Sequence, residues 1–183
     1  MGDNICYGNG FEQILQSAKQ NTAGATVFAC EVRDPERFGV VSFDKDGNAA
    51  SLEEKPKTPK SNFAVTGLYF YDNKVVSYAQ QLKPSSRGEL EITELNKVYL
   101  AHNALHVARL ERGFVWLDTG THESILQAAK FVYSMQNQGI AIACLEEIAL
   151  QKGFITKAEL AQTLSKCPSN TYYQYVSRLL NNN

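Results

Sequence analysis

Three short strings contain the residues whose types and spacing could do chemistry: Gly2-Asp3-Asn4, Glu53-Glu54-Lys55-Pro56 and Trp116-Leu117-Asp118-Thr119-Gly120. Each string lies at the end of a strand-like run, and open α/β sheets bind ligands at the carboxyl ends of their strands. Two separate aspartates, a Glu-Lys pair and turn glycines would suit a site for a sugar phosphate and a metal-bound nucleotide.

The two aspartates, Asp3 and Asp118, are candidate metal ligands because we expect both at or just beyond the carboxyl end of an extended segment. A pair of carboxylates there could hold Mg²⁺, which keeps several waters and shares its remaining positions with substrate phosphates. The alternative for Asp3 is a turn or a helix cap near the terminus. The alternative for Asp118 is the N-cap of the helix that follows.

The Glu54-Lys55 pair ends a strand and precedes a proline loop. Side chains alternate along a strand, so a carboxylate for sugar hydroxyls could lie beside a lysine that neutralises a phosphate. Arg87 is expected to open a helix and could hold a phosphate at that helix N-terminus. The alternatives are a solvated charge cluster for Glu54-Lys55 and an exposed loop arginine for Arg87.

Other catalytic patterns find no support in the sequence. His102 and His106 are four residues apart but lack acidic partners, and we expect them at the surface, with His122 in the first turn of a helix. There is no Gly-x-Ser-x-Gly elbow for nucleophilic catalysis. Gly8-x-Gly10 is the single Gly-x-Gly, and no glycine-rich loop leads from a strand into a helix with a basic residue after it, so a triphosphate cradle of that kind is absent.

Composition narrows the class of protein. The chain has 183 residues and a net charge of −1 without a basic stripe, which argues against a nucleic-acid partner. The cysteines Cys6, Cys30, Cys144 and Cys167 have no CxxC spacing, so we expect free thiols in a reducing cytosol. No signal peptide or membrane-length apolar run is visible, which predicts a soluble cytoplasmic protein.

Hydrophobic patterning predicts an α/β sheet followed by a helical tail. Strands are predicted at 25–32, 38–43, 49–54, 63–71, 105–110 and 114–117. Helices are predicted at 11–20, 73–82, 90–101 and 121–138, then at 144–150, 156–165 and 172–180 after Gly139. We therefore expect two domains, a sheet-bearing part at 1–139 and a helical appendage at 140–183.

Six ordered motifs give the chain a family resemblance: GDN (2–4), DPERFGVV (34–41), SLEEKP (51–56), KSNFAVTGLYFYD (60–72), SSRGELEITELN (85–96) and RGFVWLDTGTH (112–122). Together with CLEEIAL (144–150), they closely resemble bacterial glucose-1-phosphate thymidylyltransferases, the dTDP-glucose synthases of the rhamnose pathway. The resemblance implies the C-terminal part of a Rossmann-like nucleotidyltransferase fold, a mixed sheet flanked by helices with a small helical appendage.

The resemblance also implies roles for individual residues. Mg²⁺ would be held by Asp3 and Asp118, and the sugar phosphate would be contacted by Lys55 and Arg87. The glucosyl group would be bound by Asn4, Glu54 and the backbones of Gly39 and Val65, with Tyr69 and Trp116 lining the pocket. The substrates would be glucose 1-phosphate and dTTP, and the enzymes of the family are usually cytoplasmic homotetramers.

The family begins with a glycine-rich loop of the form GGxGTRL, which this chain lacks. We therefore expect a chain that lacks the nucleotide-binding portion and is inactive alone. Two alternatives stay open: a sugar-phosphate nucleotidyltransferase with another base preference, or a non-catalytic module for sugar-phosphate binding or assembly.

Overall fold

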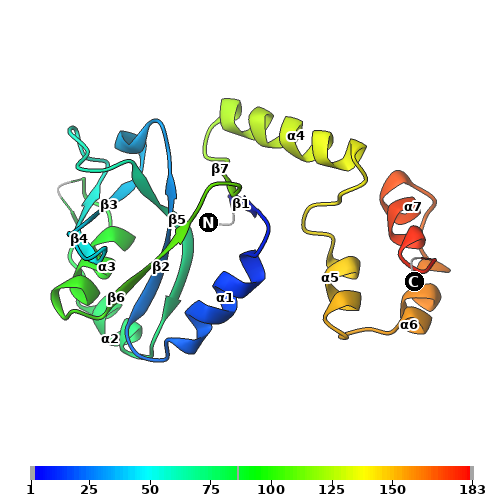
Figure 1. Cartoon of the computed structure of the whole chain (residues 1–183), viewed down its shortest axis with the longest axis horizontal. Helices are drawn as coiled ribbons and strands as arrows, with labels where there is room; N and C mark the ends of the chain where they lie inside the picture. The colour runs from blue at the N-terminus through cyan, green and yellow to red at the C-terminus, as the bar shows by residue number, and fades with distance from the viewer. Residues whose placement is uncertain (1–2, 86, 182–183) are drawn as a thin grey trace. The chain divides into compact units, whose positions relative to one another are not determined.

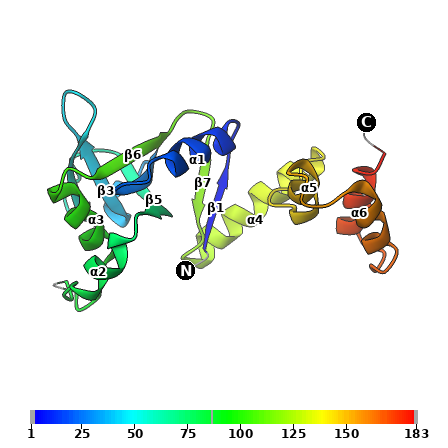
Figure 2. The same ribbon diagram turned by 90° about the horizontal axis from the view of Figure 1, so that it is seen from below.

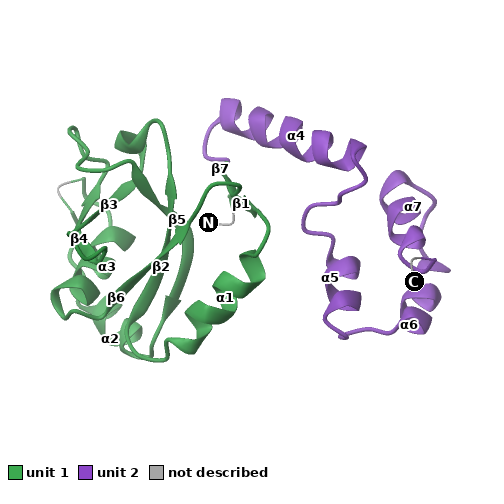
Figure 3. Ribbon diagram, viewed as in Figure 1, with its two compact units in different colours: residues 1–118 green, residues 119–183 purple. Residues whose placement is uncertain are grey.

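The structure is a computed structural model that describes residues 3–85 and 87–181 (Figure 1). The chain forms two compact units, residues 1–118 and 119–183 (Figure 3). Helix α4 (His122–Asn137) therefore groups with the later helices, whereas the sequence analysis places it with the sheet.

A mixed sheet forms the centre of the first unit. Its strand order is β4 (Ala49–Glu54), β3 (Gly39–Phe43), β5 (Phe63–Tyr71), β2 (Ala25–Glu31) and β6 (Leu105–Leu110). Strand β2 runs antiparallel to β5 and parallel to β6, and all its residues except the last are buried. The continuous apolar sequence of this strand follows from that burial on both faces.

Helices cover both faces of the sheet (Figures 1 and 2). On one face, α1 (Phe11–Gln20) packs its apolar side against Phe28 and Leu110. On the other face, α2 (Lys74–Gln80) and α3 (Ile92–Ala101) enclose a second cluster around Leu95 and Tyr99. The layered α/β arrangement expected from the sequence is therefore present.

A cation contact connects the two edges of this sheet. The Arg109 guanidinium of β6 lies 3.7 Å from the ring centroid of Phe43, and its Nη2 donates to the carbonyl of Gly47 at 3.3 Å. Gly47 belongs to the turn between β3 and β4, at the far end of the strand order. The β3–β4 hairpin is thus held at its turn by the opposite edge strand.

A separate two-stranded sheet corrects one expectation. Strand β1 (Asn4–Tyr7), which the sequence analysis did not predict, pairs antiparallel with β7 (Val115–Asp118). Asp3 therefore lies at the amino end of a strand, not at its carboxyl end. Because the pairing is antiparallel, the start of β1 still lies beside the end of β7.

One further expectation needs correction. Arg87 does not open a helix, because α3 begins only at Ile92 and Arg87 lies in the loop before it. His102 caps the end of α3 and His106 lies in β6, and both are exposed, as predicted. His122 does begin α4, as predicted.

The second unit is helical. It contains α4 and the short helices α5 (Leu145–Gln151), α6 (Lys157–Leu164) and α7 (Thr171–Arg178). Cys144, Leu160 and Val176 form its buried core, and Thr156 and Glu159 form the predicted capping box of α6. All four cysteines are free thiols. Over residues 3–85 and 87–181, every helix is too short or too polar to cross a lipid bilayer.

Tyrosine hydroxyls link α3 to β5 and to the residue that follows this strand. Tyr71 donates to Oδ1 of Asn96 at 2.6 Å, and Asn96 is only 1% exposed. Tyr99 donates to Asp72 at 2.9 Å and stacks on Tyr71 with a centroid separation of 5.5 Å. Burial is the main cause of a raised pKa for both Tyr71 and Tyr99, so both remain neutral donors at physiological pH.

We expect Tyr71→Phe to lower the free energy of unfolding by about 1–3 kcal/mol, because it leaves the buried Asn96 oxygen without its donor. Urea denaturation followed by circular dichroism measures this change. Tyr78→Phe is the matched control: the ring contact with Tyr99 survives, and the Tyr78 hydroxyl has no hydrogen bond within the described residues. Equal losses in the two variants would contradict the assignment.

Candidate active site

The β1–β7 pairing assembles the first group of candidate residues. Asn4 lies opposite Asp118 in the register, and Asp3 precedes it at the same end of the ribbon. The Trp116 indole donates to Oδ1 of Asn4 at 2.6 Å. The Nδ2 of Asn4 donates to Asp3 at 3.0 Å. Each polar atom of the Asn4 amide is therefore fixed by a neighbour, and the side chain is oriented before any ligand arrives.

The second group of candidate residues is centred on Glu54, which ends β4 and contacts Thr93 at the start of α3. Its Oε2 accepts from the Thr93 hydroxyl at 2.5 Å, and its side chain is 20% exposed. A Cβ atom at Gly39 would lie 3.0 Å from the Thr93 hydroxyl and 3.2 Å from the same Glu54 oxygen, so a side chain there would crowd this hydrogen bond. Burial, and then the nearby Glu54 carboxylate, raise the pKa of Tyr69 to about 12. Tyr69 therefore stays a neutral phenol beside Glu54.

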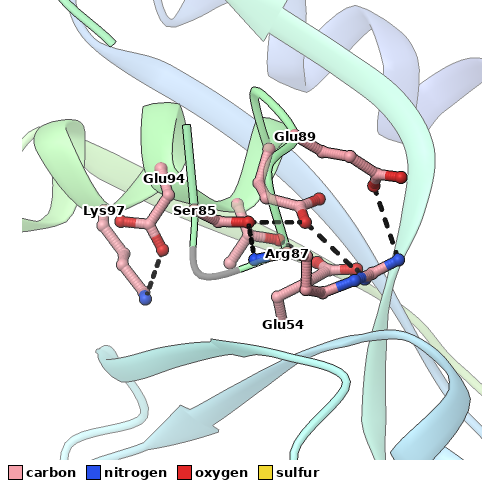
Figure 4. Close-up of polar contacts among 8 residues, drawn as sticks. Glu54, Ser85, Arg87, Glu89, Glu94 and Lys97 are labelled. Carbon is pink, nitrogen blue, oxygen red and sulfur yellow. Dashed lines mark hydrogen bonds and ion pairs between the residues drawn. The ribbon is translucent and has the colours of Figure 1, made fainter. Parts of the chain in front are cut away.

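Arg87 lies among carboxylates (Figure 4). Its Nη1 is 3.8 Å from Glu54 and 3.6 Å from Glu91, and its Nη2 is 3.4 Å from Glu89. The guanidinium is thus beside Glu54, the carboxylate that the sequence analysis expects to bind the sugar. A planar guanidinium can bind a phosphate through two parallel hydrogen bonds, which suits this position for an anionic group.

Lys55 adopts a backbone conformation that is unusual for its type. Its φ is 42°, in the left-handed region, and its N–H donates to the carbonyl of Phe38 at 2.9 Å. Non-glycine residues in this region carry a steric cost of about 1–2 kcal/mol. Such strain is concentrated at functional sites, where the surrounding structure holds it in place.

Phe38 joins the two groups. Its carbonyl receives the Lys55 N–H, while its ring packs against Trp116 with a centroid separation of 4.9 Å. Val65, Gly67 and Tyr69 belong to β5, whose register against β2 shifts between Val65 and Tyr69. A Cβ atom at Gly67 would meet the Asn4 side chain, and Tyr69 lies close enough to the Glu54 carboxylate for that charge to raise its pKa. These contacts bring Asn4, Glu54 and Tyr69 near one another within the first unit.

Four contributors were missed by the sequence analysis: Phe38, Ser85, Glu91 and Thr93. All four residues lie within the motifs DPERFGVV and SSRGELEITELN, and this position was the sequence feature that could have identified them. Their contacts with Trp116, Arg87 and Glu54 depend on tertiary pairing, which residue type and spacing do not specify.

The chemistry of the Asp3–Asp118 end of the ribbon fits a divalent cation. Two carboxylates at adjacent strand ends supply the hard oxygen ligands that Mg²⁺ accepts, and this cation usually takes its remaining ligands from waters and substrate phosphates. Within residues 3–85 and 87–181, no cluster of three or more histidine, cysteine or acidic side chains is arranged around a metal position.

With this geometry established, comparison with known proteins assigns the family. The family model described as nucleotidyl transferase matches residues 1–135. The chain belongs to the nucleotidyl transferase family, and the predicted nucleotidyltransferase fold is confirmed.

Its relatives have a more specific name. The chain is 56% identical to the glucose-1-phosphate thymidylyltransferase of Neisseria meningitidis, over 98% of this chain and 63% of the relative. It is 48% identical to that of Xanthomonas campestris, over 98% of this chain and 61% of the relative. The chain thus spans less than two thirds of the length of these curated relatives, and the predicted resemblance to this group is confirmed.

A solved structure agrees with the sequence comparisons. A crystal structure from Bacillus anthracis, described as a candidate glucose-1-phosphate thymidylyltransferase in complex with a sucrose, is 43% identical. The alignment covers 71% of this chain and 51% of the Bacillus anthracis chain, with a TM-score of 0.62.

We expect Gly67→Ala to displace Asn4, because the added Cβ would lie 2.4 Å from Asn4 Nδ2. Trp116 is the only tryptophan of the chain and donates to Asn4, so its fluorescence emission should shift. In a double-mutant cycle, Gly67→Ala made in an Asn4→Ala background should add little further shift. Additive shifts would contradict the steric coupling.

We expect Lys55→Gly to be more stable than Lys55→Ala by about 1 kcal/mol, because glycine adopts a positive φ without the steric cost. Chemical denaturation of the two variants measures the difference. The same pair of substitutions at the exposed Lys57, which has no positive φ, serves as the control and should not favour glycine. If Lys55→Ala were as stable as Lys55→Gly, the backbone at residue 55 would not be strained.

Proposed function

We propose that this chain carries the sugar-phosphate half of a glucose-1-phosphate thymidylyltransferase. The observation that supports this most directly is the pairing of Glu54 with Arg87: a largely buried carboxylate for sugar hydroxyls lies within ion-pair distance of a cation for the phosphate. The names of the relatives supply the substrate class. The complete enzyme would form dTDP-glucose and pyrophosphate from dTTP and glucose 1-phosphate.

The reaction needs little proton transfer from the protein. A phosphate monoester has a second pKa of about 6, so glucose 1-phosphate is mostly a dianion at pH 7. One of its oxygens would attack the α-phosphorus of the nucleotide, and pyrophosphate would leave. The main difficulty is to bring two polyanions together, so catalysis depends on positioning and charge neutralisation.

Each residue of the site has a defined task in this proposal. Glu54, oriented by the Thr93 hydroxyl, would accept hydrogen bonds from sugar hydroxyls. Lys55 and Arg87 would neutralise the sugar phosphate. Asn4, held by Trp116, would fix the sugar from the ribbon side, and the neutral Tyr69 would line the pocket.

Asp3 and Asp118 would hold a divalent cation, which we propose to be Mg²⁺. When bound, it would supply positive charge to the phosphates of the nucleotide. The sequence contains no glycine-rich triphosphate cradle, so the base preference and the homotetrameric assembly expected for the family belong to the complete protein. A panel of nucleoside triphosphates with the complete protein would distinguish dTTP from other bases.

The test is a phosphorus NMR titration of glucose 1-phosphate with this chain in the presence of Mg²⁺. We expect a saturable shift of the phosphate signal, and a loss of affinity of at least about tenfold in Arg87→Ala, because charge-assisted phosphate contacts are strong. Lys97→Ala is the matched control, since Lys97 pairs with Glu94 at 2.7 Å outside the Arg87 cluster. A folded wild-type chain without saturable binding, or an unaffected Arg87→Ala variant, would overturn the proposal.

A further inference from the structure

The loop that carries Arg87 is folded back on itself. The Ser85 N–H donates to the carbonyl of Glu89 at 2.8 Å, and the Gly88 N–H donates to the carbonyl of Ser85 at 2.9 Å. The Arg87 N–H donates to the Ser85 hydroxyl oxygen at 3.1 Å. Gly88 has a φ of 79°, which lets the chain reverse without steric cost. This turn places both Glu89 and Glu91 beside the guanidinium of Arg87.

The two ends of the Arg87 guanidinium have different surroundings (Figure 4). Nη1 points to carboxylates that are mostly buried: the side chain of Glu91 is 11% exposed and that of Glu54 is 20% exposed. Nη2 faces Glu89, whose side chain is 63% exposed. One end of the cation therefore faces the interior of the site, and the other end faces solvent.

Because Glu91 is more buried than Glu89, we expect its ion pair with Arg87 to be the more stable of the two. A largely buried carboxylate is costly unless it is paired and hydrogen-bonded, and Glu91 meets both conditions. Its Oε1 accepts from the Ser85 hydroxyl at 3.2 Å and lies 3.6 Å from Arg87 Nη1. The exposed Glu89 contact is of the kind that contributes little to stability, so an anion with higher charge can replace it.

We propose that Glu91 is a positioning residue that holds Arg87 through Nη1, and that Glu89 occupies Nη2 until a phosphate group displaces it. The identity of that phosphate as the sugar phosphate rests on the proposed function. The division of labour itself rests on the burial and the contacts of the two glutamates. Removal of the two negative charges should therefore change phosphate affinity in opposite directions.

A simple charge argument predicts a different result. If the acidic side chains acted only through their field, neutralising any of them would strengthen phosphate binding. Glu94 provides the reference for this effect, because it lies on α3, pairs with Lys97 and stays outside the Arg87 cluster. Glu94→Gln therefore measures the general effect of one lost negative charge on the same loop-helix segment.

The experiment titrates glucose 1-phosphate and, separately, inorganic phosphate against Glu89→Gln, Glu91→Gln and Glu94→Gln. We expect Glu89→Gln to tighten binding by about two- to fivefold, the range of an exposed ion pair that no longer competes. We expect Glu91→Gln to weaken binding by about tenfold, because the guanidinium loses its buried charged partner. Glu94→Gln should stay close to wild type.

A readout without ligand tests the positioning directly. ¹⁵N relaxation of the Arg87 Nε–H group should show a more mobile guanidinium in Glu91→Gln, but not in Glu94→Gln. Ser85→Ala, which removes the hydroxyl that orients Glu91, should give a smaller change in the same direction if Glu91→Gln fails to fold. An Arg87 side chain as ordered in these variants as in wild type would overturn the inference.

The two readouts also distinguish this inference from the proposed function. If the wild-type chain binds neither phosphate probe while Arg87 loosens in Glu91→Gln, positioning by Glu91 stands and the sugar-phosphate function fails. If both probes bind and the Glu89→Gln and Glu91→Gln variants shift affinity in the same direction, the division of labour between the two glutamates is wrong.

Discussion

The candidate site depends on the antiparallel pairing of β1 with β7. This ladder places Asn4 opposite Asp118 and allows a hydrogen bond between Trp116 and Asn4, which are 112 positions apart in the chain. Without it, the two aspartates would have no common location, and the Asn4 side chain would lose the contact that orients it. Phe38 extends this constraint, because it contacts Trp116 with its ring and the Lys55 backbone with its carbonyl.

A second constraint is electrostatic. Arg87, the cation that we propose for the phosphate, lies beside three carboxylates, so the chain compensates its charge internally. Such compensation keeps a solvent-accessible arginine in a defined place. Any anion that binds Arg87 would have to exchange one ion pair for another, which would favour a dianion over a singly charged anion.

The sequence predicted the elements better than it predicted their relations. The continuous apolar run of β2 and the aromatic run of β5 identified buried strands, because burial on both faces leaves a local signature. Strand β1 was missed, since its four residues carry no alternation and are stabilised by pairing with a segment distant in sequence. Arg87 was assigned to the start of a helix, but it lies in a turn that is stabilised by backbone hydrogen bonds between Ser85, Gly88 and Glu89. Residue types alone did not distinguish this turn from a helix start.

For the site, residue type and family motif identified Glu54, Lys55, Arg87 and the two aspartates as candidates. Neither could indicate that Lys55 adopts a positive φ or that Glu91 is buried against Arg87, because both features arise from the surrounding packing. The roles of these residues toward a substrate stay predictions.

The Arg109 contact has a mechanical consequence. The β3–β4 hairpin, which ends in Glu54, is fastened at its turn by Arg109 and at its open end by the Lys55 N–H. The Lys55 N–H bond closes the ladder of the hairpin itself, whereas the Arg109 bond ties its turn to another strand. Glu54 is thus placed by strand pairing at one end of a hairpin whose other end is tethered across the sheet.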